Sequence, residues 1–319
     1  KARKADCPTL LFNLISNQME QFFTMSLGNL IWLWQLARLG RHFTNSIHRL
    51  SLLNKRANIG KNQIKVIAVQ DNTEQQLRKV AIITGAAHRI GAVIAYNLHQ
   101  AGMNVVLHYR HSAEAAEKVC SNLNQQRANS AMTLQADLHS DAALQPLIEQ
   151  AQQQWGRLDV LINNASSFYP TPVGEADVAQ WDELLGSNLK APFFLSMAAA
   201  PYLKRFKGTI VNIVDIHAER PLKGYPIYSI AKAGLVMMTK SLACELGPDV
   251  RVNAVAPGAI LWPEHNMNDE MKERIISRTF LKRQGQPADI AKAILFLIEG
   301  APYTSGHVLT VDGGRSLNS

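Results

Sequence analysis

Cysteine is scarce in this sequence of 319 residues, and the three that occur, Cys7, Cys120 and Cys244, lie far apart. They form no C-x-x-C pair and no metal-ligand pattern, so the sequence indicates neither a disulfide framework nor a metal site. The simplest interpretation is a protein of a reducing compartment, the cytoplasm. Cys244 occurs within a helical pattern, and we expect it to be a small core residue.

The main body of the chain also lacks an excess of charge. The formal net charge is +8, but residues 1–79 hold 12 Lys/Arg and 4 Asp/Glu, and residues 80–319 hold 21 of each sign. The basic balance therefore belongs to the N-terminal segment, and the main body carries no electrostatic signature of nucleic-acid binding. The apolar fraction of 47% is that of a folded protein with a sizeable core.

The N-terminal segment lacks a clean hydrophobic run. Residues 22–39 are rich in apolar side chains, but Asn29, Gln35 and Arg38 interrupt them, and the stretch barely reaches the length of a membrane span. A membrane-surface helix within residues 19–41 is one interpretation, and a leader, or residues that the natural protein lacks, is the preferred one. We therefore expect residues 1–77 to be an N-terminal extension, poorly ordered or an anchor.

From Lys79 onward, short apolar runs alternate with helical patterns. Strands that alternate with helices form parallel sheets with right-handed crossovers, covered by helices on both faces. The sequence therefore predicts one α/β domain over residues 78–319, a doubly wound parallel sheet of about seven strands of the Rossmann type. The predicted strands are 80–83, 104–109, 131–136, 158–163, 209–214, 250–255 and 307–311, and predicted helices include 113–125 and 141–155.

A glycine-containing turn joins the first predicted strand to the helix that follows. Residues 84–91 read T-G-A-A-H-R-I-G, in which Gly85 permits a tight turn and Gly91 permits close packing of the helix. Backbone N–H groups at a helix N-terminus can bind a pyrophosphate. The sequence therefore predicts a dinucleotide-binding turn, with Arg89 in place of the usual middle glycine and Ile90 beside it. A plain strand-to-helix turn is the alternative.

No acidic side chain follows the second predicted strand. Such an acid binds the free ribose hydroxyls of NAD, whereas cations suit the 2′-phosphate of NADP. The stretch reads H-Y-R-H-S, with Tyr109 in second place. We expect Arg110 to bind this phosphate, helped by Ser112 and His111, and NADPH to be the preferred cofactor. An arginine in a solvated loop is the alternative. Asp137, at the end of the third strand, fits an adenine contact.

Three groups capable of proton chemistry occur between residues 215 and 232. Tyr228 and Lys232 are four residues apart, so on a helix they share one face, and the lysine ammonium would lower the pKa of the phenol. Asp215 follows a buried apolar run, at the carboxyl end of a strand, where open α/β sheets bind their ligands. The pattern favours Tyr228 as a proton donor and acceptor. A solvated helix face is the alternative for Y-x-x-x-K alone.

Six features, in this order, resemble the short-chain dehydrogenase/reductases across residues 78–319. They are T-G-x-x-x-x-x-G at 84–91, D-L at 137–138, N-N-A at 163–165, Asn188, Y-x-x-x-K at 228–232 and P-G at 257–258. Two departures narrow the resemblance, because Asp215 replaces a serine of the family pattern and Arg89 replaces the middle glycine. Both departures, and the stretch N-N-A-S-S-F-Y-P-T-P at 163–172, are similar to the pteridine reductases and dihydromonapterin reductases.

The resemblance implies NADPH-dependent reduction of a C=N bond in a pterin. Phe168 would stack the pterin against the nicotinamide, Tyr228 would deliver a proton, and Asp215 would hydrogen-bond the pterin or the tyrosine. The remaining motif residues have implied roles too. Lys232 would hold the nicotinamide ribose with water-mediated support from Asn188, and Trp262 would close over the substrate. Arg89 and Ser166 would contact pterin and cofactor phosphate, Asp137 and Leu138 the adenine, and Asn164, Ala165, Pro257 and Gly258 the nicotinamide.

Several points stay open on the sequence alone. The resemblance implies a homotetramer assembled through helices around 189–205 and 228–246. The cations run Arg110-His111, whereas the order in the reductases it resembles is His-Arg, so their individual roles are open. The substrate could be dihydromonapterin, dihydrobiopterin or dihydrofolate. A ketone reductase acting on a 3-oxoacyl thioester or a sugar, and a catalytically silent NADPH-binding protein, are the alternatives to a pterin reductase.

Overall fold

The computed structural model describes residues 77–261 and 268–318, all within one compact unit, Val69–Ser319. In these residues seven parallel strands form one sheet in the order β3-β2-β1-β4-β5-β6-β7. The first strand, β1, therefore lies in the middle of the sheet. The next two strands extend the sheet outward to β3, and the chain then crosses back to form β4 on the other side of β1. The strands are β1 (Val80–Ile83), β2 (Asn104–Tyr109), β3 (Ala131–Gln135), β4 (Val160–Asn163), β5 (Thr209–Ile213), β6 (Arg251–Pro257) and β7 (Val308–Val311).

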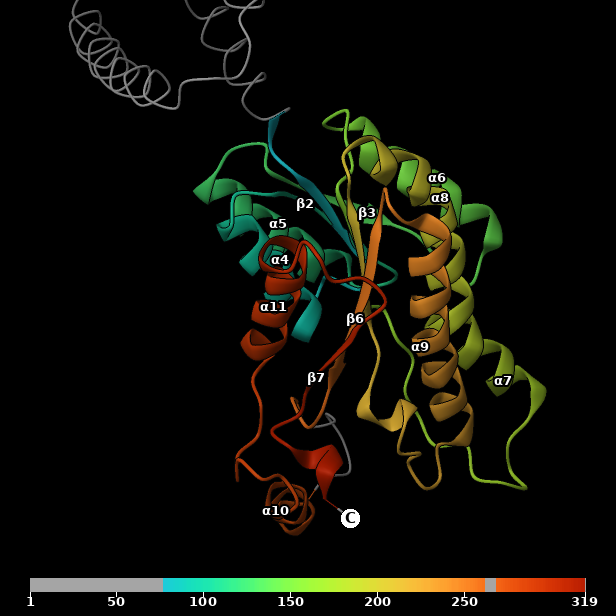
Figure 1. The fold of residues 1–319 in the computed structure, drawn as a ribbon. Helices are drawn as coiled ribbons and strands as arrows, with labels where there is room; N and C mark the ends of the chain where they lie inside the picture. The colour runs from blue at the N-terminus through green and yellow to red at the C-terminus, as the bar shows by residue number, and fades with distance from the viewer. Residues whose placement is uncertain (1–76, 262–267, 319) are drawn as a thin grey trace, which may run out of the picture. The chain divides into compact units, whose positions relative to one another are not determined.

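The direction of building reverses between β1 and β4, which are direct neighbours. Their register pairs Ala81 with Val160 and Ile83 with Ile162. The N–H of Thr84 continues this ladder past the end of β1 by donating to the carbonyl of Ile162 at 3.0 Å. Open α/β sheets bind ligands outside the carboxyl ends of the strands at such a reversal. These ends point to the bottom of Figure 1, where α10 and the C-terminus lie.

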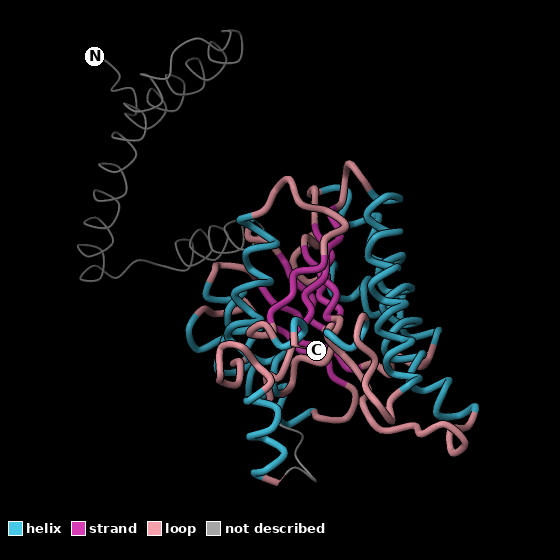
Figure 2. Tube along the Cα trace, turned by 60° about the horizontal axis from the view of Figure 1, so that its bottom comes forward, coloured by secondary structure: helices cyan, strands magenta, loops and turns pink. Residues whose placement is uncertain are grey.

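Helices cover both faces of the sheet, so that the strands are enclosed between two helical layers (Figures 1 and 2). One layer contains α4 (Arg89–Gln100), α5 (Ala113–Gln126) and α11 (Pro287–Leu295). The other contains α6 (Asp141–Gln153), α8 (Ala191–Arg205) and α9 (Pro226–Leu246), with α7 (Val178–Leu185) at its end. The short helix α10 (Asp269–Ser277) lies apart from both layers, below the sheet in Figure 1.

Each face of the sheet has its own hydrophobic core, which explains why the strands have continuous apolar sequences. Successive strand residues point to opposite faces. In β1, Val80 and Ile82 belong to the core under α6, α8 and α9, whereas Ala81 and Ile83 belong to the core under α4, α5 and α11. All four side chains are fully buried. A strand covered on both faces shows no polar alternation, as the sequence of this sheet predicts.

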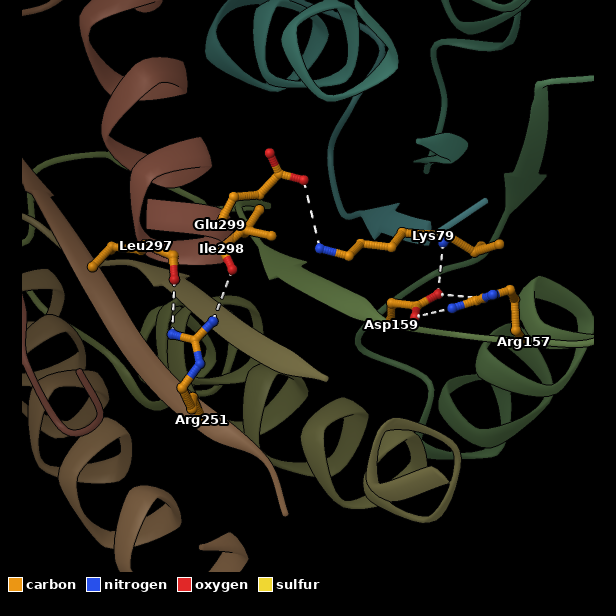
Figure 3. A network of polar contacts seen from close by, with 8 residues as sticks. Lys79, Arg157, Asp159, Arg251, Leu297, Ile298 and Glu299 are labelled. Atoms are coloured by element: carbon orange, nitrogen blue, oxygen red, sulfur yellow. Dashed lines mark hydrogen bonds and ion pairs between the residues drawn. The ribbon is translucent and has the colours of Figure 1, made fainter. Parts of the chain in front are cut away.

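A network of polar contacts ties the amino ends of the strands together (Figure 3). Asp159 Oδ2 accepts hydrogen bonds from the N–H of Val80 at 2.8 Å and from Arg157 Nε at 2.9 Å. The guanidinium of Arg251 donates to the carbonyls of residues 297 and 298 at 2.8 and 2.9 Å, where the helix after α11 ends. A helix end leaves such carbonyls to be satisfied from outside. The network thus stabilises the edge of the sheet opposite to its ligand-binding edge.

The predicted Rossmann-type doubly wound sheet of seven strands is confirmed, with strand bounds that shift by one or two residues. The expectation for Cys244 was wrong: its side chain is exposed on α9, because the buried stripe of that helix runs through Leu242 and Leu246 instead. No helix in the described part of the chain is long and apolar enough to cross a membrane. Residues 1–76 of the predicted extension, and with them residues 19–41, lie outside the described residues.

Candidate active site

A pocket of about 800 Å³ lies along the carboxyl ends of the strands. It runs from the ends of β2 and β3, past the turn between β1 and α4, to the ends of β4, β5 and β6. Two predicted site residues are not in its wall: Asn188 lies behind it, and Trp262 lies outside the described residues. The pocket brings together the other predicted residues, Gly85, Arg89, Ile90, Gly91, Tyr109, Arg110, His111, Ser112, Asp137, Leu138, Asn164, Ala165, Ser166, Phe168, Asp215, Tyr228, Lys232, Pro257 and Gly258.

The turn between β1 and α4 requires glycine at two positions. Gly85 has a φ of +64°, a conformation that side chains disfavour. A Cβ on Gly91 would lie 2.1 Å from the carbonyl oxygen of Gly85 and 2.7 Å from Asn164 Nδ2, so no larger residue fits there without a shift of the backbone. The N-terminus of α4 therefore comes close to the turn, and its N–H groups and helix dipole can hold a phosphate.

Arg89 has a backbone conformation that favours glycine. Its φ is +53°, in the left-handed region, which costs a residue with a side chain about 1–2 kcal/mol.

On the other side of the turn, Asn164 Nδ2 donates to the carbonyl of Thr84 at 2.8 Å, and the N–H groups of Asn164 and Ala165 donate to Thr84 Oγ1 at 2.9 and 3.0 Å. The end of β4 is therefore fixed to the turn.

The side of the pocket formed by β2 and β3 carries an ion pair. Arg110 Nη2 lies 3.0 Å from Asp137 Oδ2, and both side chains are more than 40% exposed. Burial acts to raise the pKa of Asp137, but the N–H of His139 and the guanidinium of Arg110 outweigh it, and the pKa lies below its ordinary value. Arg110 was predicted to bind a phosphate and Asp137 an adenine. In the structure both residues line the pocket beside the carboxyl ends of β2 and β3, and they are paired with each other.

Tyr228 and Asp215 are joined directly. The hydroxyl of Tyr228, on the first turn of α9, donates to Asp215 Oδ2 at 2.9 Å, and Asp215 Oδ1 accepts from the N–H of His217 at 2.8 Å. Asp215 follows β5 and caps the short helical turn after it, so its carboxylate is held by backbone and side chain together. Burial raises the pKa of Tyr228 well above its ordinary value, and the charge and hydrogen bond of Asp215 raise it further.

Lys232 is buried one helical turn after Tyr228. Its ammonium donates to the carbonyl of Ile213 at 2.9 Å and lies 5.6 Å from the centre of the Tyr228 ring. Burial lowers its pKa to about 8, against the charge of Asp215, which acts to raise it. The predicted net lowering of the Tyr228 pKa was therefore wrong, because burial and the acceptor Asp215 outweigh the charge of Lys232 and favour the protonated phenol. At neutral pH Tyr228 holds its proton.

Asn188 organises the loop after β4. It belongs to a π-helical turn (Gly186–Lys190) between α7 and α8, a geometry that often occurs at functional sites. Its Oδ1 accepts from Ser166 Oγ at 2.7 Å, and its Nδ2 donates to the carbonyls of Ser167 and Leu184, both at 2.9 Å. These contacts fix Ser166 and Ser167, the residues directly before Phe168. The predicted support of Lys232 by Asn188 through water stays a prediction.

Phe168 lies in an aromatic cluster at the mouth of the pocket. Its ring stacks on Tyr225 with centroids 4.7 Å apart and planes at 11°, and it meets the Tyr228 ring edge-on at 4.8 Å and 77°. The Phe168 ring is 46% exposed, so one part of it remains available to a ligand. The sequence reasoning missed Tyr225. Its place three residues before Tyr228, directly ahead of α9, was the signal that could have found it.

Comparison with known proteins places the chain in a family. Residues 85–316 match the family described as enoyl-(acyl carrier protein) reductase. The chain belongs to the short-chain dehydrogenase/reductase family. Pteridine reductase 1 of Leishmania tarentolae is 36% identical over 281 residues, covering 75% of this chain and 96% of that protein. A protein named as a ketoacyl reductase of granaticin polyketide synthase from Streptomyces violaceoruber is 37% identical over 245 residues, covering 75% and 96%.

A third relative has the same level of similarity. The 3-oxoacyl-[acyl-carrier-protein] reductase FabG of Staphylococcus aureus is 34% identical over 243 residues, covering 75% of this chain and 98% of its own. As a short-chain dehydrogenase/reductase, the protein is an NAD(P)-dependent reductase. The pocket fits such a dinucleotide, because the crowded glycine turn leaves backbone N–H groups at a helix N-terminus and Arg110 lines the pocket after β2.

Three histidines of the pocket wall were also missed. His88 precedes α4, His108 is the fifth residue of β2, and His139 follows Asp137. Their sequence positions gave little signal, because a single histidine next to a strand end occupies no fixed position in any of the motifs above. Within this short-chain dehydrogenase/reductase, they surround the part of the pocket between the glycine turn and Arg110.

Proposed function

We propose that this protein reduces a C=N bond of a pterin, with NADPH as the source of hydride. The observation that carries the proposal is the 2.9 Å hydrogen bond from the Tyr228 hydroxyl to the Asp215 carboxylate. A serine at this place suits a carbonyl substrate, because it donates a hydrogen bond to oxygen. A carboxylate suits a basic, nitrogen-rich ring, because it accepts hydrogen bonds from ring N–H and amino groups.

The aromatic cluster supports a flat substrate. Phe168 presents a half-exposed ring beside Tyr228, and Tyr225 backs it in a parallel stack. A planar heterocycle that lies against Phe168 gains stacking energy of about 0.5–1.5 kcal/mol beyond its buried area. The contacts of Asn188 with residues 166 and 167 support this wall.

The residues of the site would divide the reaction as follows. NADPH supplies the hydride, which goes to the carbon of the C=N bond. Tyr228, whose raised pKa keeps it protonated, stands ready to give a proton to the nitrogen. Asp215 orients the phenol, and its carboxylate can pass on to the phenolate a proton that it takes from water. Lys232 contributes positive charge beneath the phenol, so that the phenolate formed in this step is stabilised.

The preference for NADPH over NADH is part of the proposal. No acidic residue occupies the end of β2, where Arg110, His111 and Ser112 line the pocket. The exposed Arg110 can turn from Asp137 to a 2′-phosphate, which accepts two hydrogen bonds from a guanidinium. The family relationship alone supports NAD(P)H without this distinction.

Reduction of a ketone is the rival function. The relative from Staphylococcus aureus is named as a 3-oxoacyl reductase, and it is about as similar to this chain as the pteridine reductase is. Sequence identity therefore does not separate the two substrates, and the proposal depends on Asp215 and Phe168. A protein that binds NADPH and reduces neither substrate would be the catalytically silent alternative.

Substitution of Asp215 tests the proposal at the residue that carries it. We expect Asp215→Ser and Asp215→Asn to lower the rate with a dihydropterin at least about a hundredfold, while NADPH affinity and Tm stay near those of the wild type. Asn keeps the shape of the side chain and removes its charge, so it separates acid–base chemistry from packing. Full pterin reduction by Asp215→Ser would remove the argument from the carboxylate.

We also propose that the protein is a cytoplasmic homotetramer. A row of exposed apolar side chains on α8 and α9, Phe193, Phe194, Met197, Ile230 and Met237, supports an assembly surface. Light scattering coupled to gel filtration measures the mass directly. The substitutions Met237→Asp and Met237→Lys should dissociate the tetramer. A monomeric wild type would contradict the proposed assembly.

A further inference from the structure

His108 connects the glycine turn to the end of β3. It is 2% exposed, and its ring lies between two backbone groups. The N–H of Gly85 donates to Nδ1 at 3.2 Å, and Nε2 lies 3.1 Å from the carbonyl oxygen of Ala136. The His108 carbonyl also accepts from the N–H of Ala86 at 2.9 Å. One residue of β2 thus holds two successive N–H groups of the turn, and its ring reaches the residue before Asp137.

These partners determine which ring nitrogen carries the proton. The Gly85 N–H can only donate, so Nδ1 must present its lone pair. The Ala136 carbonyl can only accept, so Nε2 must carry the hydrogen. The neutral ring with hydrogen on Nε2 satisfies both contacts. A doubly protonated ring would place an N–H at Nδ1 against the N–H of Gly85, two donors facing each other.

The turn that His108 holds has little room to change. Gly85 has its φ at +64°, and the Cα of Gly91 is so close to the Gly85 carbonyl that a methyl group does not fit between them. A small movement of Gly85 would therefore either displace the N-terminus of α4 or clash with it. The N–H groups that face the pocket at this point are those available to a pyrophosphate.

We propose that His108 is a positioning residue for the dinucleotide: its neutral ring, protonated only on Nε2, holds the glycine turn in the shape that binds pyrophosphate, and a second proton on the ring releases the turn. This inference needs only the NAD(P)H chemistry of the family. A failure of the pterin proposal would leave it unchanged, and its tests measure cofactor binding without a substrate.

The surroundings of His108 keep the ring neutral. Burial lowers its pKa from 6.5, whereas the Ala136 carbonyl and the charge of Asp137 act in the opposite direction. The pocket wall near the ring also carries Arg110 after β2, His139 after β3, and His88 and Arg89 at the start of α4. A group with a lowered pKa contributes stability that is present above its unfolded value of 6.5 and is lost as the pH falls toward the folded value.

A pair of substitutions separates the two nitrogens. His108→Asn places Oδ1 at the position of Nδ1 and can still accept from Gly85, whereas His108→Gln places an amide near Nε2 and leaves the Gly85 N–H without its acceptor. We expect the dissociation constant for NADPH, measured by fluorescence titration, to rise less than about threefold in the His108→Asn variant and at least about tenfold in the His108→Gln variant. The KM for NADPH should follow the dissociation constant, with kcat unchanged.

His99 provides the matched control. It is also 2% exposed, its Nε2 lies 2.7 Å from Ser130 Oγ, and it belongs to the far end of α4, away from the pocket. His99→Asn and His99→Gln should lower Tm and leave NADPH binding unchanged. Equal losses of NADPH affinity in His108→Asn and His108→Gln, or wild-type affinity in Gln, would overturn the proposal.

The pH dependence gives a test that does not rely on the Gln variant folding. As the pH falls below 6.5, the wild type should lose NADPH and NADH affinity more steeply than His108→Asn does. The ratio of the two proteins removes every contribution that they share, and the use of NADH removes that of the 2′-phosphate. Identical slopes would overturn the proposal. So would a wild-type affinity that rises in acid, since this would make the protonated ring a phosphate ligand.

Discussion

The hydroxyl of Tyr228 donates to the carboxylate of Asp215 across 2.9 Å. This bond changes the chemistry expected from a tyrosine and a lysine four residues apart. Asp215 and burial raise the pKa of the phenol, and burial lowers that of Lys232 to about 8. Of the two groups the lysine therefore titrates closer to neutral pH, and the phenol is a proton donor that Asp215 orients.

Removal of the phenol hydroxyl should stop the chemistry and spare the binding. In Tyr228→Phe the ring and its edge contact with Phe168 remain, while the proton donor is lost. We expect kcat to fall about a thousandfold and the dissociation constant for NADPH to change less than about threefold. Single-turnover kinetics and a fluorescence titration measure the two quantities. A variant that retained a tenth of the wild-type rate would remove Tyr228 from its role.

The pKa of Lys232 predicts the alkaline limb of activity. The ammonium is lost above about pH 8, far below its ordinary value of 10.5. If the charged form is the active one, kcat/KM for NADPH should decrease about tenfold per pH unit above this pKa. The phenol titrates well above its ordinary value and makes no contribution to the limb. Lys232→Arg keeps its charge and should show no decrease near pH 8; a limb that persists in this variant would assign it to another group.

The glycine turn should not tolerate a methyl group. In Gly91→Ala the new Cβ would lie 2.1 Å from the Gly85 carbonyl, so the turn or α4 must move. We expect NADPH affinity to fall at least about a hundredfold. Gly156→Ala is the control, since its Cβ meets nothing within 4 Å and only its φ of +72° opposes the change. This control should lose about 1 kcal/mol of stability and no affinity. Wild-type affinity in Gly91→Ala would exclude the turn from the binding site.

Arg110 should decide between the two dinucleotides. Its guanidinium pairs with Asp137 beside the carboxyl ends of β2 and β3, and both groups are exposed enough to separate. Arg110→Ala should weaken NADPH binding about tenfold to a hundredfold and change NADH binding little, because only NADPH carries the 2′-phosphate. Arg205→Ala, an exposed arginine at the end of α8, is the control. An equal loss for both dinucleotides would assign Arg110 to a structural role with Asp137.

The sequence predicts the sheet because both of its faces are covered. Continuous apolar runs such as Val80–Ile83 have no other stable place than between two helical layers, and the intervening helices set the parallel order. The same logic brings Asp215 and the glycine turn to one edge. The predicted topology of the sheet, rather than any single motif, therefore indicates that the site residues lie close together in space.

The errors and omissions concern contacts between residues far apart in the chain. The pKa of Tyr228 depends on its depth and on the distance to Asp215, which residue spacing does not give. His108 is hydrogen-bonded to Gly85, 23 positions earlier in the chain. Phe168, in the loop after β4, stacks on Tyr225, which directly precedes α9. Cys244 was placed in the core because α9 is apolar on most of its surface, so its buried stripe is poorly defined by pattern alone.

Oxidation of NADPH in the presence of a panel of substrates tests the central claim most directly. The panel contains dihydromonapterin, dihydrobiopterin, biopterin, dihydrofolate and one 3-oxoacyl thioester, each also assayed with NADH. We expect turnover of at least one pterin with preference for NADPH, and little turnover of the thioester. Reduction of the thioester with no pterin turned over would contradict the account and make the protein a ketone reductase with an unexplained Asp215.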